Sequence, residues 1–249
     1  MRILISPAKQ MIVDTDSFAI DALPQFLPQT EQLLQAMRAL APAALQAIWK
    51  CSDSLAAQNF ERLAQMDLQH GLTPALLAYD GIQYRCMAPG VFEYGQYDYL
   101  REHLRILSGF YGLLRPFDGV APYRLEMQAK LSVGGSSDLY AFWGGHLAAQ
   151  LTDESGLLIN LASREYSEAV RPYLPASVRF VTCRFAERRG SRLIEKGMPC
   201  KMARGWMVRW MVENRIDAPE ALRAFDERGY RFSPADSNED QLVFLKGEN

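Results

Sequence analysis

The sequence lacks the short cysteine and histidine spacings that are typical of metal sites, and it has only four cysteines. No cysteine forms a CxxC pair, and none lies at metal-ligand spacing from one of the three histidines. Zinc sites in proteins usually show such short spacings between their ligands. We therefore expect no metal site and no cofactor. We expect reduced, mostly buried thiols at the four cysteines, Cys51, Cys86, Cys183 and Cys200.

Long apolar runs are also missing. No run approaches the roughly 20 apolar residues that a membrane-spanning helix needs. The N-terminal run is interrupted by Pro7 and is too short for a signal peptide. Hydrophobic residues make up 49% of the 249 residues, which is enough for a sizeable core. We expect a cytoplasmic protein without membrane contact that folds as one domain over residues 1–249.

A large net charge is absent as well, since the formal value is −2. This argues against a uniformly basic nucleic-acid binder, but the charges are unevenly distributed. Lys and Arg number 11 against 16 Asp and Glu in residues 1–163, 12 against 5 in residues 164–215, and 4 against 8 in residues 216–249. The basic segment could form a phosphate-attracting surface, or its arginines could pair with the acidic flanks.

Two short apolar runs, residues 2–6 and 157–161, predict buried strands. Each run is followed by polar residues, with Lys9 after the first and Arg164 and Glu165 after the second. If the strands are parallel neighbours, these side chains converge at the sheet edge where α/β proteins tend to bind ligands. Further strands are expected at 104–107, 178–187, 229–232 and 241–246.

Hydrophobic periodicity and capping residues predict helices between these strands. They are expected over residues 29–40, 42–49, 54–68, 73–81, 139–151, 199–214 and 219–225. Lys201, Arg204 and Gly205 share one face near the start of the helix at 199–214. Cations there oppose the helix dipole, a local conflict that is typical of functional sites. The whole pattern indicates a mixed α/β fold.

Residues 104–127 combine glycines, prolines and charges more densely than the rest of the chain. Gly109 and Gly112 interrupt an apolar aromatic run, and Arg124 and Glu126 follow Pro122. Turn residues beside mixed charge are typical of a site on a rigid scaffold. The alternative is an apolar hairpin followed by a solvated ion pair. Residues 80–100, rich in Tyr, Gly and Pro, could likewise line a groove or pack into the core.

Six motifs occur in a characteristic order along the chain. They are SPAK at 6–9, LSGFYGLLRPFD at 107–118, PYRLEM at 122–127, LYAFWG at 139–144, NLASREY at 160–166 and KMARG at 201–205. Through this ordered set the sequence resembles the YaaA peroxide-stress-resistance protein family over essentially its whole length. The resemblance implies a protein that is induced by hydrogen peroxide and lowers unincorporated iron, which limits Fenton damage.

The resemblance also implies a structure and a ligand. The fold would be a single α/β unit of unusual topology, the cantaloupe-type fold, with a helix-hairpin-helix-like element at 107–113. A basic cleft would bind double-stranded or structured DNA. The matched DNA-binding positions are Lys9, Arg124, Arg164, Lys201, Arg204, Gly109 and Gly112. Here Met202 and Glu168 stand where lysines are common in the family, and both changes lower the local positive charge.

A second function is compatible with the same residues. Lys9, Glu126 and Glu165 could form a nucleophilic or acid–base set of an enzyme that acts on a nucleobase, a nucleotide or another anionic small molecule. A cluster of Lys, Glu and Arg is also compatible with a purely structural ion-pair network. Direct iron binding would have to rely on scattered carboxylates, because the sequence has no His/Cys cluster.

Overall fold

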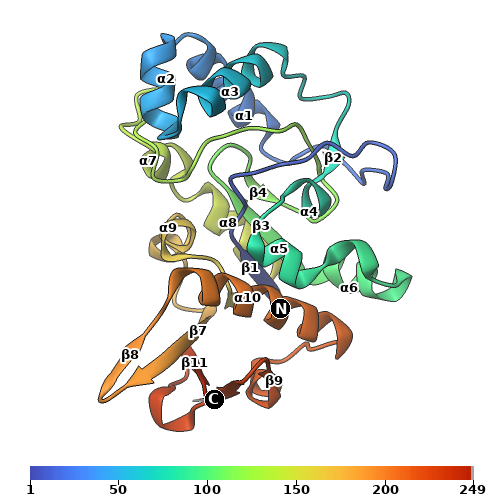
Figure 1. Ribbon diagram of the computed structural model, residues 1–249, viewed down its shortest axis with the longest axis vertical. Helices are drawn as coiled ribbons and strands as arrows, with labels where there is room; N and C mark the ends of the chain where they lie inside the picture. Colours follow the sequence, from blue (N-terminus) through green and yellow to red (C-terminus); the bar gives the residue numbers. More distant parts are fainter. Residues whose placement is uncertain (248–249) are drawn as a thin grey trace.

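Five parallel strands form the centre of the computed structural model, which describes residues 1–247 (Figure 1). In spatial order they are β3 (Leu104–Ser108), β1 (Arg2–Ile5), β6 (Leu157–Asn160), β7 (Arg179–Arg189) and β11 (Gln241–Lys246). Antiparallel strands are added by β4 (Gly112–Leu114) on β3, β8 (Arg192–Ile194) on β7, β10 (Tyr230–Phe232) on β11 and β9 (Asp226–Glu227) on β10. The predicted strands and the mixed α/β class are confirmed.

The order of these strands changes direction at β1. The chain runs from β1 to β3 on one side and then returns to place β6 on the other side. Leu4 of β1 is accordingly paired with Arg105 of β3 and with Asn160 of β6. The predicted parallel pairing of the strands at 2–6 and 157–161 is thus confirmed. In open α/β sheets a ligand-binding crevice forms where the strand order reverses in this way.

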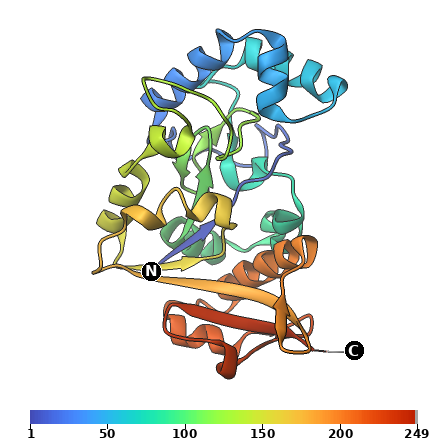
Figure 2. The same cartoon turned by 90° about the vertical axis from the view of Figure 1, so that its left-hand side faces the viewer.

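Helices cover the sheet and extend one end of the molecule. The longer ones are α1 (Leu27–Arg38), α2 (Pro42–Trp49), α3 (Asp53–Gln65), α6 (Tyr94–His103), α8 (His146–Glu154) and α10 (Gly197–Glu213). The shorter ones are α4 (Ala75–Ala78), α5 (Ile82–Met87), α7 (Leu139–Trp143) and α9 (Arg164–Ser167). Figure 2 shows α1–α3, in blue, at one end and the chain after residue 179, in orange to red, at the other. None of the helices in residues 1–247 is long and apolar enough to cross a bilayer.

Three predicted helices differ from the structure. Thr73–Pro74 form strand β2, which pairs with β5 (Gly119–Val120), so that only the short α4 follows them. The predicted helix at 139–151 is divided into α7 and α8, because Gly144 adopts a positive φ of 46° that a helix cannot contain. Residues Pro219–Ala224 form a 3-10 helix rather than an α-helix.

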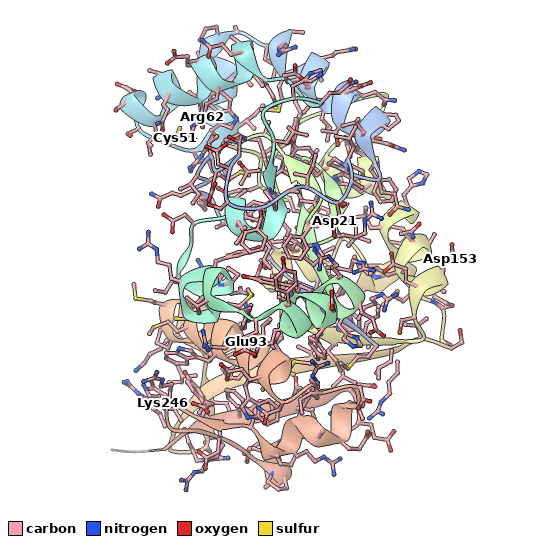
Figure 3. The ribbon with its side chains drawn as sticks, turned by 90° about the vertical axis from the view of Figure 1, so that its right-hand side faces the viewer. Asp21, Cys51, Arg62, Glu93, Asp153 and Lys246 are labelled. Atoms are coloured by element: carbon pink, nitrogen blue, oxygen red, sulfur yellow. The ribbon has the colours of Figure 1, made fainter. Side chains whose placement is uncertain are left out.

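The central strands are buried on both faces. Ile3, Leu4 and Ile5 of β1 have no exposed surface. Such complete burial is expected for parallel strands that are covered by helices. The four cysteines are free thiols. Cys51 lies at the α2–α3 end, whereas Lys246 lies toward the opposite end (Figure 3).

Candidate functional site

A cavity of about 500 Å³ opens beside the carboxyl ends of β1 and β6. It therefore lies at the point where the strand order reverses, the usual ligand position in such sheets. Four stretches of chain and α10 contribute to its walls. They are residues 6–10, 80–84 and 123–126, and Ser163, Glu165 and Tyr166, together with Lys201 and Arg204.

The loops after β1 and β6 are tied to each other at the floor of the cavity. The Ser163 amide donates a hydrogen bond to Ser6 Oγ at 2.8 Å, and the two hydroxyl oxygens lie 3.3 Å apart. From α5, the buried Tyr84 hydroxyl donates to the Ser6 carbonyl at 2.9 Å. These bonds fix the relative positions of the two strand ends that carry Lys9 and Glu165.

The segment that carries Arg124 and Glu126 is held against the β3–β4 hairpin. A Cβ atom on Gly109 would lie 2.6 Å from the Leu125 carbonyl oxygen, so only glycine allows this approach. The Tyr123 hydroxyl lies 2.7 Å from Ser108 Oγ in the same hairpin. Gly109 is therefore buried next to the segment that carries Arg124 and Glu126, and it allows this segment to pack against the hairpin.

Three of the predicted site residues form a charged group at one side of the cavity. Lys9 Nζ lies 2.7 Å from Glu126 Oε1, and Arg124 Nη2 lies 3.9 Å from the same oxygen. Arg124 Nε also donates to the Trp49 carbonyl at 3.1 Å. The Lys9 side chain is 61% exposed and that of Arg124 only 11%. Lys9 thus lies at the mouth of the cavity and Arg124 further inside.

Glu165 supplies a second carboxylate on the opposite strand loop. Burial raises its pKa above the usual range, and the nearby Glu126 carboxylate raises it further. A hydrogen bond from the Gln128 amide to Oε1, at 3.3 Å, and the charge of Lys9 act against this rise. A carboxyl group with a raised pKa close to a lysine is suited to accept and return a proton.

Helix α10 contributes an exposed and a buried cation. Lys201 is exposed, whereas Arg204 is largely buried, and burial lowers the pKa of its guanidinium. The helix lies so close to α5 that a Cβ on Gly205 would be 2.2 Å from the Gln83 carbonyl oxygen. This contact brings the Gln83 side chain to the same wall as Arg204.

Sequence reasoning missed Gln83, although the stretch at 80–100 was a candidate groove lining. Its position depends on the packing of α5 against α10, two helices more than 100 residues apart in the chain. The Tyr, Gly and Pro content of the stretch was the available signal, and residues 80–84 do line the cavity. The pattern alone could not select Gln83 within that stretch.

Three predicted DNA contacts do not reach the cavity. The Arg164 side chain is 92% exposed and is not part of the cavity lining, and its Nε atom lies 3.8 Å from Glu168 Oε1. Gly109 and Gly112 are buried in the β3–β4 hairpin, where Ser108 Oγ accepts from the Phe110 and Tyr111 amides. The helix-hairpin-helix-like element is unsupported at 107–113, because two strands and not two helices flank the turn.

The basic segment at 164–215 is partly neutralised by its neighbours. Two arginines pair with the acidic C-terminal flank, as Arg179 does with Glu220 at 3.1 Å and Arg188 with Asp236. Others pair within the segment, namely Arg184 with Glu195, Lys196 with Glu187 and Arg209 with Glu213. The alternative that the arginines pair with the acidic flanks therefore holds for Arg179 and Arg188, and the phosphate-attracting surface stays a prediction. The segment presents Lys201 and Arg204 to the cavity.

Side chains that could hold a metal ion are not clustered in residues 1–247. Within the described residues, no group of three or more His, Cys, Asp or Glu side chains is placed to hold a metal ion.

Comparison with known proteins identifies the family. The family profile described as "Peroxide stress protein YaaA" matches residues 1–236. A UPF0246 protein of Lachnoclostridium phytofermentans is 49% identical over 249 residues, which cover 100% of this chain and 98% of the relative. UPF0246 proteins of Agathobacter rectalis and Pediococcus pentosaceus are 48% and 47% identical, with at least 98% of each chain covered. The chain therefore belongs to the YaaA family of peroxide stress proteins.

Proposed function

We propose that this peroxide stress protein binds DNA through the cavity at the carboxyl ends of β1 and β6, and that this binding limits damage by free iron. The observation that carries the proposal is the convergence of four cations on one cavity. Lys9, Arg124 and the α10 pair Lys201 and Arg204 come from three separate parts of the chain and line the same cavity. Such a concentration of positive charge attracts the phosphate backbone of nucleic acids.

The exposed lysines are the natural contacts for a duplex. Lys9 and Lys201 lie at the mouth, where backbone phosphates can approach them, whereas Arg124 and Arg204 lie deeper. Gly109 and Gly112 do not take part in this proposal, because they are buried. Glu168 offsets the charge of Arg164, its neighbour at 3.8 Å, which favours weaker binding than in relatives with a lysine there.

A salt series with matched variants tests this proposal. We expect the Lys9→Gln/Lys201→Gln variant to bind a short duplex more weakly in fluorescence anisotropy. The slope of log affinity against log salt is negative, and its magnitude should decrease by about 2. Each lost phosphate contact lowers that magnitude by about 0.9, and two lysines are replaced.

The control changes the same net charge elsewhere. Arg189 and Arg192 lie exposed at the tip of the β7–β8 hairpin, which projects from the body in Figure 1, and no ion pair to them occurs within residues 1–247. An Arg189→Gln/Arg192→Gln variant should keep the wild-type slope. Equal losses in both variants would mean that general charge and not the cavity binds DNA.

A reaction on a small anionic molecule is the second candidate function. It is favoured by the contact of Lys9 with Glu126 at 2.7 Å and by the raised pKa of Glu165 in the same cavity. In this proposal Glu165 exchanges a proton with the substrate, while Lys9 and Glu126 act as an acid–base or nucleophilic pair.

The two functions predict different behaviour of one variant. If chemistry is required, Glu165→Gln should bind duplex DNA at least as tightly as the wild type and yet fail to protect cells from hydrogen peroxide. Survival of peroxide-treated cells that carry the variant is the measurement. Full protection would show that the carboxyl group is dispensable and would leave DNA binding as the function.

A further inference from the structure

The inner wall of the cavity, between α5 and α10, carries two buried donor atoms to which neither proposed function assigns a hydrogen-bond partner. Gln83 is only 6% exposed, and its Nε2 atom has no hydrogen-bond partner among residues 1–247. The same is true of Arg204 Nε, which is also buried. Burying a polar donor without a partner is costly, and more so when the group is charged. Two such donors on one cavity wall indicate that a bound ligand supplies the missing acceptors.

The backbone around this wall is closely packed. At one end, a Cβ on Gly205 would be 2.2 Å from the Gln83 carbonyl oxygen. At the other end, a Cβ on Gly81 would be 2.8 Å from the Ala8 side chain in the loop after β1. Helix α5 is thus fixed between α10 and the β1 loop. The backbone positions from which the Gln83 and Arg204 side chains extend are therefore fixed, which favours a preorganised site.

The charge of the cavity suggests which ligand fits. Four cations and three carboxylates, Asp80, Glu126 and Glu165, line it. Asp80 is held by two hydrogen bonds from Arg85, at 2.7 and 2.9 Å, outside the lining. With Arg85 counted, the cations exceed the carboxylates by two charges. A phosphate monoester carries close to two negative charges near neutral pH and would balance this excess.

We propose that Arg204 and Gln83 form a subsite for a phosphate monoester. A guanidinium matches the oxygens of a phosphate in geometry and charge, and the amide of Gln83 donates to a further oxygen. A cavity of about 500 Å³ is large enough for a nucleotide-sized ligand. The internal diester of an intact strand has only one charge and is flanked by sugars on both sides. The subsite therefore selects a terminal phosphate, on a free nucleotide or on a DNA strand end.

This inference rests on the proposed role of the cavity as the ligand site, and calorimetry tests it separately. The probes are deoxyadenosine monophosphate and deoxyadenosine. We expect the wild-type protein to bind deoxyadenosine monophosphate at least tenfold more tightly than deoxyadenosine. Gln83→Met and Arg204→Met should each lose at least tenfold for the nucleotide, whereas Arg192→Gln should match the wild type.

A stability measurement separates a ligand subsite from a structural role. Because each methionine replaces an unpartnered donor with an apolar group, both variants should keep or raise the melting temperature of the ligand-free protein. If either variant melts well below the wild type, its donor supports the fold and the assignment of that residue is overturned.

A second pair of probes identifies the source of the phosphate. A duplex with 5′-phosphates should bind more tightly than the same duplex with 5′-hydroxyls if strand ends are the ligand. Equal binding of the two duplexes, together with binding of the nucleotide, would assign the subsite to free nucleotides. Equal binding without any nucleotide binding overturns the subsite, while salt-dependent duplex binding would still support the proposed function.

Discussion

Glu165 illustrates how the cavity sets the chemistry of a single residue. It is half-buried, faces Glu126 and accepts a weak hydrogen bond from the Gln128 amide. Arg164, its neighbour in the sequence, lies in solvent. Sequence analysis predicted that both side chains converge with Lys9, and only Glu165 does so. The direction of two adjacent side chains depends on the first turn of α9, which the composition of the segment does not fix.

The raised pKa of Glu165 predicts a pH dependence of DNA binding. Above this pKa the carboxylate repels phosphate, and as the pH falls through it protonation removes that charge. Because burial places the pKa above the ordinary value of 4.5 for a glutamate, affinity should rise as the pH is lowered from neutral toward 4.5. We expect a gain of roughly threefold to tenfold, the effect of about 1 kcal/mol from one nearby charge.

Glu165→Gln provides the comparison for this effect. The variant should bind more tightly than the wild type at pH 7 and should show a smaller rise on acidification. Anisotropy titrations between pH 4.5 and 7.5 at constant salt measure both curves. Parallel curves would show that Glu165 does not titrate next to the bound phosphates.

The β3–β4 hairpin is the element that positions Arg124 and Glu126. Glycines and charged residues are dense at 104–127, and the family resemblance implied that Gly109 and Gly112 contact DNA. In the structure Gly109 instead allows the backbone at 125–127 to approach the hairpin. The Trp143 indole donates to the Gly109 carbonyl at 3.0 Å and closes the other side. These long-range contacts could not be predicted from local spacing.

Gly109→Ala should therefore destabilise the protein. The new methyl group would overlap the Leu125 carbonyl, and overpacking of this kind costs about 1–3 kcal/mol. Urea denaturation should show a lower midpoint with an unchanged slope. Gly156→Ala is the matched control, because a Cβ there meets nothing within 4 Å and the backbone has no positive φ. Equal stability of the two variants would contradict the close approach at Gly109.

At the scale of the whole molecule, the strand order places the site. The apolar runs at 2–6 and 157–161 were readable as buried strands, and their pairing as parallel neighbours was a conditional prediction that is confirmed. The burial of Gln83 depends on the contact of α5 with α10, which joins distant parts of the chain. Local periodicity could not predict this contact. The cantaloupe-type topology that the resemblance implies stays a prediction.

Hydrogen–deuterium exchange with and without duplex DNA tests the central claim most directly, because it maps the ligand onto the chain without any substitution. The account predicts slower exchange in the cavity segments at 8–10, 124–127, 163–166 and 200–204 when DNA is bound. The β7–β8 hairpin, with Arg189 and Arg192 at its tip, should be unchanged. Protection confined to that hairpin, with unchanged exchange in the cavity segments, would contradict the assignment of the cavity as the DNA site.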